Sequence, residues 1–194
     1  EYIWGHIGNQ EQRLADLEML QSLAKLLNTT SHKLRALFRK ARYSFHVSEF
    51  NESLGHSQAL LHLARAAADD QMVYEAQAML GRVYFRLGEY DQAWEHLELG
   101  LHLARALSLP AEESTMLSLM ANIAFIRHKI QSAQTMFQQS LAISERIGDR
   151  SEAIYSAHIN SGRLYVYQGQ HEAARHHYQT ALQLSQEVGD RQTE

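Results

Sequence analysis

The chain repeats itself with a period of about 40 residues. One position marks the register, recurring at intervals of 40, 40, 40 and 41 residues: Gly8, Ser48, Gly88, His128 and Gly169. Each complete unit also holds two small residues 12 positions apart: Ala41/Ser53, Gly81/Ala93, Ala121/Ala133 and Gly162/Ala174. A fixed period of this size predicts a stacked array of one supersecondary unit, and such an array usually offers a binding surface.

Each unit is predicted to be a helix, a short turn and a second helix. In the second complete unit, apolar residues recur every three or four positions from Val73 to Tyr84, Gly88 interrupts them, and a second stripe starts at Ala93. This spacing is typical of two amphipathic helices. The small pairs mark where the two helices cross closely. Helix ends are predicted at Gly148 and Gly189, because glycine suits a left-handed turn, and a capping box at 149–152 begins the next helix.

The register divides the chain into units of one all-α domain spanning 1–194. A partial unit covers 1–28, complete units cover 31–69, 70–109, 110–149 and 150–189, and 190–194 begins a further unit. The first residues include no initiator methionine and no signal peptide, which indicates a piece of a longer protein. Both ends then cut through an array, so we expect self-association through exposed repeat ends.

Composition narrows the classes of function. Hydrophobic residues make up 45% and charged residues 21% of the 194, as in a soluble globular protein. No apolar run reaches the roughly 18 to 20 residues that a membrane crossing needs. The chain has no cysteine, which is compatible with a reducing, cytoplasmic compartment. A formal net charge of −4 argues against a nucleic-acid partner.

Two segments carry a family resemblance. Residues 88–93 (Gly-Glu-Tyr-Asp-Gln-Ala) and 169–174 (Gly-Gln-His-Glu-Ala-Ala), with a glycine seven positions before each, resemble the tetratricopeptide repeat. The first and third units are weaker copies, with Ser48 and His128 in place of the turn glycine. The units exceed the common 34 residues and lack the usual closing proline. Such long repeats are similar to those of multidomain bacterial signalling proteins, beside an ATPase, a nucleotide cyclase or a kinase. The resemblance implies an α-solenoid that winds as a right-handed superhelix.

The resemblance also places the first helix of each pair on the concave side of the array. Two columns then line its outward face: Arg42, Arg82, Asn122 and Arg163, and Phe45, Phe85, Phe125 and Val166. Arginine beside aromatic rings is typical of binding hot spots. The alternatives are that the Phe column packs between helices and that the arginines only solvate the surface. The predicted partner-binding residues are Arg35, Phe38, Arg39, Arg42, Phe45, Arg82, Phe85, Arg86, Asn122, Phe125 and Arg163.

No catalytic or metal-binding motif accompanies the repeat. The sequence has no nucleophile elbow, phosphate loop or HExxH motif. Histidines repeat on the second helices as His56, His96 and His177, and as His62 and His102, but without the spacing of a metal site. These histidines are predicted to be packing or surface residues. We therefore predict no catalytic residue, no metal and no cofactor.

The function predicted from these features is a non-catalytic interaction or regulatory scaffold. It would capture a peptide, an acidic one in particular, or a partner domain in the concave groove. One alternative is a ligand-sensing domain that controls an attached ATPase, cyclase or kinase. Another is an architectural spacer or self-assembly element.

Overall fold

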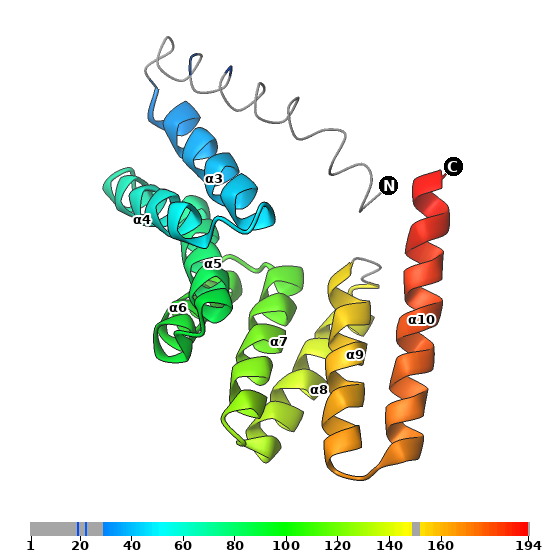
Figure 1. Ribbon diagram of the computed structural model, residues 1–194. Coiled ribbons are helices and arrows are strands. Elements are labelled where there is room, and N and C mark those ends of the chain that lie inside the picture. Colours follow the sequence, from blue (N-terminus) through cyan, green and yellow to red (C-terminus); the bar gives the residue numbers. More distant parts are fainter. Residues whose placement is uncertain (1–18, 20–21, 23–28, 149–151, 194) are drawn as a thin grey trace. The chain divides into compact units, whose positions relative to one another are not determined.

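The computed structural model describes Met19, Ser22, residues 29–148 and residues 152–193. Over these ranges the chain forms eight long α-helices and no strand (Figure 1). They are α3 (Thr30–His46), α4 (Phe50–Ala66), α5 (Asp70–Leu87), α6 (Tyr90–Ala106), α7 (Pro110–Ile126), α8 (Ile130–Arg146), α9 (Glu152–Tyr167) and α10 (His171–Thr193). Apart from Met19 and Ser22, the predicted partial unit 1–28 lies outside the described residues, as do Asp149, Arg150 and Ser151 of the predicted capping box.

The helices end where the repeat register places a turn. Within the pairs, the turn residues have left-handed backbone with φ between 56° and 82°: Ser48, Gly88, His128 and Gly169. Between the pairs, φ lies between 50° and 62° at the corresponding residues: Ala68, Ser108 and Gly148. The predicted turn positions are therefore confirmed, including the two where serine and histidine replace glycine. A residue other than glycine in this conformation costs about 1–2 kcal/mol.

The predicted helix end at Gly189 is wrong. Helix α10 continues through this residue to Thr193. Glycine permits a left-handed turn without enforcing one, and within a helix it costs only about 0.5–1 kcal/mol relative to alanine. Gly148, by contrast, follows the last residues of α8 with a φ of 62°.

Contacts divide the chain into two compact units, residues 1–93 and 94–194. In the first unit, α4 packs against both α3 and α5, and α3 also contacts α5. Leu34, Leu60, Ala64 and Ala76 form one buried cluster there, and Ala41, Met79 and Val83 form another. Half-buried Phe38 packs on the first cluster and Phe45 on the second.

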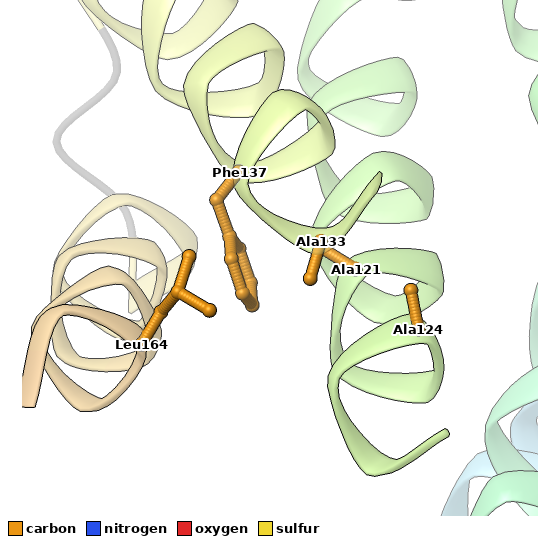
Figure 2. Close-up of a cluster of buried hydrophobic side chains, with 5 residues drawn as sticks. All are labelled: Ala121, Ala124, Ala133, Phe137 and Leu164. Carbon is orange, nitrogen blue, oxygen red and sulfur yellow. The ribbon is translucent and has the colours of Figure 1, made fainter. Parts of the chain in front are cut away.

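In the second unit, α7 packs against α8 and α9 packs against α10, each as an antiparallel pair (Figure 1). Helix α8 contacts α9 and so joins the two pairs. Figure 2 shows the ring of Phe137 on α8 lying between Leu164 of α9 and the alanines of α7 and α8. Phe125 and Trp94 pack against this cluster from its edge.

The small residues lie where the helices of a pair approach each other. Ser53 Oγ donates a hydrogen bond to the Ala41 carbonyl oxygen at 2.8 Å, and both residues are fully buried. A Cβ atom added at Gly162 would lie 2.6 Å from Tyr178 Cε1 on the facing helix, closer than carbon atoms approach. Any larger side chain would therefore push α9 and α10 apart or displace the Tyr178 ring.

Candidate functional site

The first unit presents a basic face on the predicted binding helices. Helix α3 carries five basic residues and no acidic one in its 17 residues. Four of these Lys and Arg residues are exposed, Lys33, Arg35, Arg39 and Arg42, and α5, which contacts α3, adds exposed Arg86. We call the four arginines the basic face.

Aromatic rings hold part of the basic face in place. The Arg86 guanidinium lies 5.0 Å from the Phe50 ring centre and 5.9 Å from that of Phe45. These two rings meet edge to face at 5.6 Å. The Arg42 guanidinium lies 5.6 Å above the Phe38 ring on its own helix. Such contacts restrict the arginine side chains before a ligand arrives, which reduces the entropy lost on binding.

The remaining predicted residues of the first unit are more enclosed. Arg82 and Phe85 on α5 are both half-buried. The Phe85 ring lies 5.8 Å from that of Tyr90. Phe38 and Phe45 contribute to the packing between helices, as described above, and still keep part of their surface exposed. Phe38 and Phe45 therefore pack between helices, and their part in binding a partner stays a prediction.

The corresponding face of the second unit is mainly apolar. Four exposed hydrophobic side chains share it, and we call them the apolar face: Ile126, Ile159, Val166 and Tyr167. The Tyr167 ring meets the Phe125 ring edge to face at 5.6 Å. The exposed Arg163 guanidinium lies 6.0 Å from the centre of the Phe125 ring. Half-buried Asn122 donates its amide to the Ser118 carbonyl oxygen of its own helix at 3.1 Å.

The predicted arginine column is thus shared between the two units. Arg42 and Arg82 belong to the first unit, whereas Asn122 and Arg163 belong to the second. That all four face one channel stays a prediction.

Sequence reasoning missed two buried polar clusters. One consists of Ser114, Ser140 and Ser144, all at most 2% exposed, between α7 and α8. Ser114 Oγ lies 2.9 Å from Ser140 Oγ and 2.7 Å from Ser144 Oγ, and it also donates to the Ser140 carbonyl oxygen. The other cluster joins His158 to His177 across α9 and α10. Ser114 and Ser140 stand where the first complete unit has Leu34 and Leu60, whereas the position of His177 is also histidine at His56 and His96.

Among the described residues, neither a cluster of metal-binding side chains nor a membrane-spanning helix is found. Among them, no group of three or more His, Asp or Glu side chains could hold a metal ion. Of the repeated histidines, half-buried His56 has a lowered pKa because of burial and of nearby Lys40, partly offset by Glu52. Across the same residues, no helix has the length and apolar character that spanning a bilayer would require.

Family comparisons agree with the helix-pair architecture. Models of the tetratricopeptide repeat match residues 74–106 and 112–187, which together make up more than half of the chain. The chain belongs to the tetratricopeptide repeat family, and its fold is the all-α repeat solenoid of that family. The chain has no significant match among curated protein sequences.

Solved structures of low sequence identity share the fold. BtubC (BKLC) from P. vanneervenii is 19% identical with a TM-score of 0.73, covering 92% of this chain and 73% of that one. Aspartyl phosphate phosphatase F from Bacillus subtilis is 14% identical with a TM-score of 0.81, covering 95% and 49%. A Rap protein complexed with competence and sporulation factor is 15% identical with a TM-score of 0.79, covering 94% and 52%. The chain therefore spans about half the length of these last two proteins.

Proposed function

We propose that the chain is a non-catalytic interaction module whose first helices bind an acidic peptide or an acidic segment of a partner protein. The basic face carries this proposal. Arg35, Arg39 and Arg42 are exposed on a helix without an acidic residue, and Arg86 adjoins them from α5. Guanidinium groups pair with carboxylates through two parallel hydrogen bonds, which favours aspartate and glutamate over other anionic or polar groups.

The apolar face of the second unit is a separate surface that would bind a segment of its own chemistry. Ile159 and Val166 lie one turn before and one turn after Arg163 on α9, and all three are exposed. A segment bound there would place large apolar side chains against Ile159 and Val166 and a carboxylate on Arg163. Burying this apolar surface supplies affinity, while the arginine restricts which segments fit.

One structural neighbour is a Rap protein solved in complex with competence and sporulation factor. Likeness to that protein supports a peptide-binding module at the level of the fold alone. We further propose that the module works in the cytoplasm as one part of a larger signalling protein. The absence of cysteine and the long repeats support this assignment.

The test uses a defined probe and a matched pair of variants. The probe is a fluorescein-labelled 12-residue peptide that alternates Asp or Glu with Leu, and its control carries Lys in place of each acid. Reversing Arg42→Glu and Arg82→Glu should weaken binding of the acidic probe at least tenfold, because each charged contact contributes about 1.5–3 kcal/mol. Reversing Arg65→Glu and Arg146→Glu makes the same charge change on exposed residues of second helices, α4 and α8.

The two double variants give opposite predictions. The second pair should bind within about threefold of the wild type, and circular dichroism should show that both variants stay helical. Because Arg82 is half-buried, Arg39→Glu with Arg42→Glu serves as a further reversal at two exposed positions. If the Arg39→Glu/Arg42→Glu variant and the Arg65→Glu/Arg146→Glu variant lose affinity equally, binding depends only on the net charge of the chain. Preference for the lysine probe would overturn the proposal.

A further inference from the structure

Two imidazoles meet inside the last helix pair. His158 of α9 is 6% exposed and His177 of α10 is half-buried. Their Nδ1 atoms lie 3.0 Å apart, and their ring centres lie 5.2 Å apart. Tyr165 stacks on His177 with ring centres 5.2 Å apart and planes 20° from parallel, which closes one side of the contact.

The residues at these two repeat positions differ between the helix pairs. They are Leu37 and His56 in α3–α4, Gln77 and His96 in α5–α6, and Leu117 and Met136 in α7–α8, where both are apolar. The α9–α10 pair is polar nearby as well, because Ser161 Oγ, one turn beyond His158, is buried without a hydrogen-bond partner.

The 3.0 Å contact constrains protonation. A hydrogen bond between two Nδ1 atoms needs one protonated nitrogen and one free lone pair, so at least one imidazole must be neutral. If both rings gain a proton, two N–H groups and two positive charges meet in a site with little water. Burial, together with the charges of His177 and His176, lowers the pKa of His158 to about 4. Burial and His176 also lower the pKa of His177, against the opposing effect of Glu145 on α8.

Two other described acidic side chains on the surrounding helices already have basic partners. On α10, Glu172 pairs with Arg175 at 3.2 Å. On α7, which also contacts α9, acidic residues occur only in the first turn, where Glu113 pairs with Arg105 at 2.8 Å. Glu145 is thus the carboxylate whose charge favours protonation in the pair, and it raises the pKa of His177 but not that of His158.

We propose that His158 and His177 form a proton-operated clasp that holds α10 against α9 near neutral pH and releases it in mild acid. The neutral pair donates one hydrogen bond across the interface. Protonation of both rings replaces that bond with repulsion, and the cost is relieved when α10 separates and both rings reach water. This proposal is independent of the ligand-binding proposal, because it concerns only the packing of one helix pair.

The direction of the pH effect follows from linkage. His158 has a lower pKa in the packed state than its ordinary value of 6.5, so the separated state binds more protons. The clasp is therefore fully effective above about pH 6.5 and weakens as the pH falls toward 4. With these two values, the equilibrium constant for opening rises about 20-fold between pH 7 and pH 5.

Hydrogen exchange at α10 measures this opening. The described α10 amides should lose protection about 20-fold between pH 7 and pH 5, after correction for the intrinsic exchange rate, while α7 amides change little. A double variant, His158→Leu with His177→Met, introduces the residues that the α7–α8 pair has at these positions, Leu117 and Met136, and should reduce the loss to less than threefold. A control, His102→Gln, removes an exposed histidine of α6 and should behave as the wild type.

Two results would overturn the clasp. One is an α10 protection loss in the double variant equal to that of the wild type. The other comes from an NMR titration of the wild-type imidazoles, which stays decisive if the double variant does not fold. The ring resonances of His158 should not titrate above pH 5, and a midpoint near 6.5 would contradict the proposal.

Discussion

The buried serine cluster between α7 and α8 should show strongly non-additive energetics. Ser114 Oγ contacts both other hydroxyls at 2.7–2.9 Å and donates to the Ser140 carbonyl oxygen, while Ser140 Oγ donates to the Ser114 carbonyl oxygen at 2.9 Å. Ser114→Ala therefore removes the shared acceptor and leaves the Ser144 hydroxyl with a poorer partner. A lost hydrogen bond costs about 1 kcal/mol and a buried unpaired group about 1–3 kcal/mol, so we expect about 2 kcal/mol for this variant.

Removing the whole cluster should cost less than the sum of its parts. Ser140→Ala and Ser144→Ala each lose one main bond and should cost about 1 kcal/mol, which gives about 4 kcal/mol for three independent changes. The triple alanine variant leaves no unpaired hydroxyl, so we expect it to lose less than about 2 kcal/mol. The first unit supports this expectation, because Leu34, Leu60 and Ala64 occupy the same three repeat positions as a buried apolar cluster.

Urea unfolding followed by circular dichroism at 222 nm measures these differences in the free energy of unfolding. In a thermal melt, Ser114→Ala should lower the melting temperature by about 4–8 °C in a chain of this size. Ser118→Ala, on the half-buried side of α7, serves as the control for helix propensity. If the triple variant loses the full sum of about 4 kcal/mol, the hydroxyls contribute independently and the reasoning is refuted.

Two further predictions concern the turns and the exposed side of α10. Ala68→Gly should stabilise the chain by about 0.5–1 kcal/mol, because exposed Ala68 has a φ of 50°; a thermal melt shifted downward would contradict this. Leu182→Glu should abolish the concentration-dependent self-association expected of the repeat array, because Leu182 is 59% exposed whereas its repeat equivalents Leu101 and Leu141 are 8% exposed. In sedimentation velocity the control Leu99→Glu, at a 49% exposed leucine of α6, should leave the association unchanged, and an equal loss in both variants would reject the α10 surface.

The fold could be predicted largely from the repeat, because a turn or a helix crossing depends on residues that lie close together in the sequence. The spacing of Ser48, Gly88, His128 and Gly169 located every turn within a helix pair, even where glycine is replaced. Gly189 was misassigned because a single glycine changes local preference by only about 1 kcal/mol, which the rest of a helix can outweigh.

The polar clusters could not be predicted in the same way. Ser114 lies 26 residues from Ser140, and His158 lies 19 residues from His177, so each contact depends on how two helices pack. Sequence reasoning grouped His177 with His56 and His96 by their shared position on second helices. It overlooked His158, whose position is leucine in α7, because no motif draws attention to a single buried imidazole.

We propose that the exposed sides of the first helices bind acidic segments, and amide chemical shifts recorded by NMR can locate that binding. When the acidic 12-residue peptide is titrated into the wild-type chain, we expect the largest shifts in α3 and α5, around Arg39, Arg42 and Arg86, and little change in α4. Shifts concentrated on α4 or α8, or none at peptide concentrations that saturate the fluorescence signal, would contradict it.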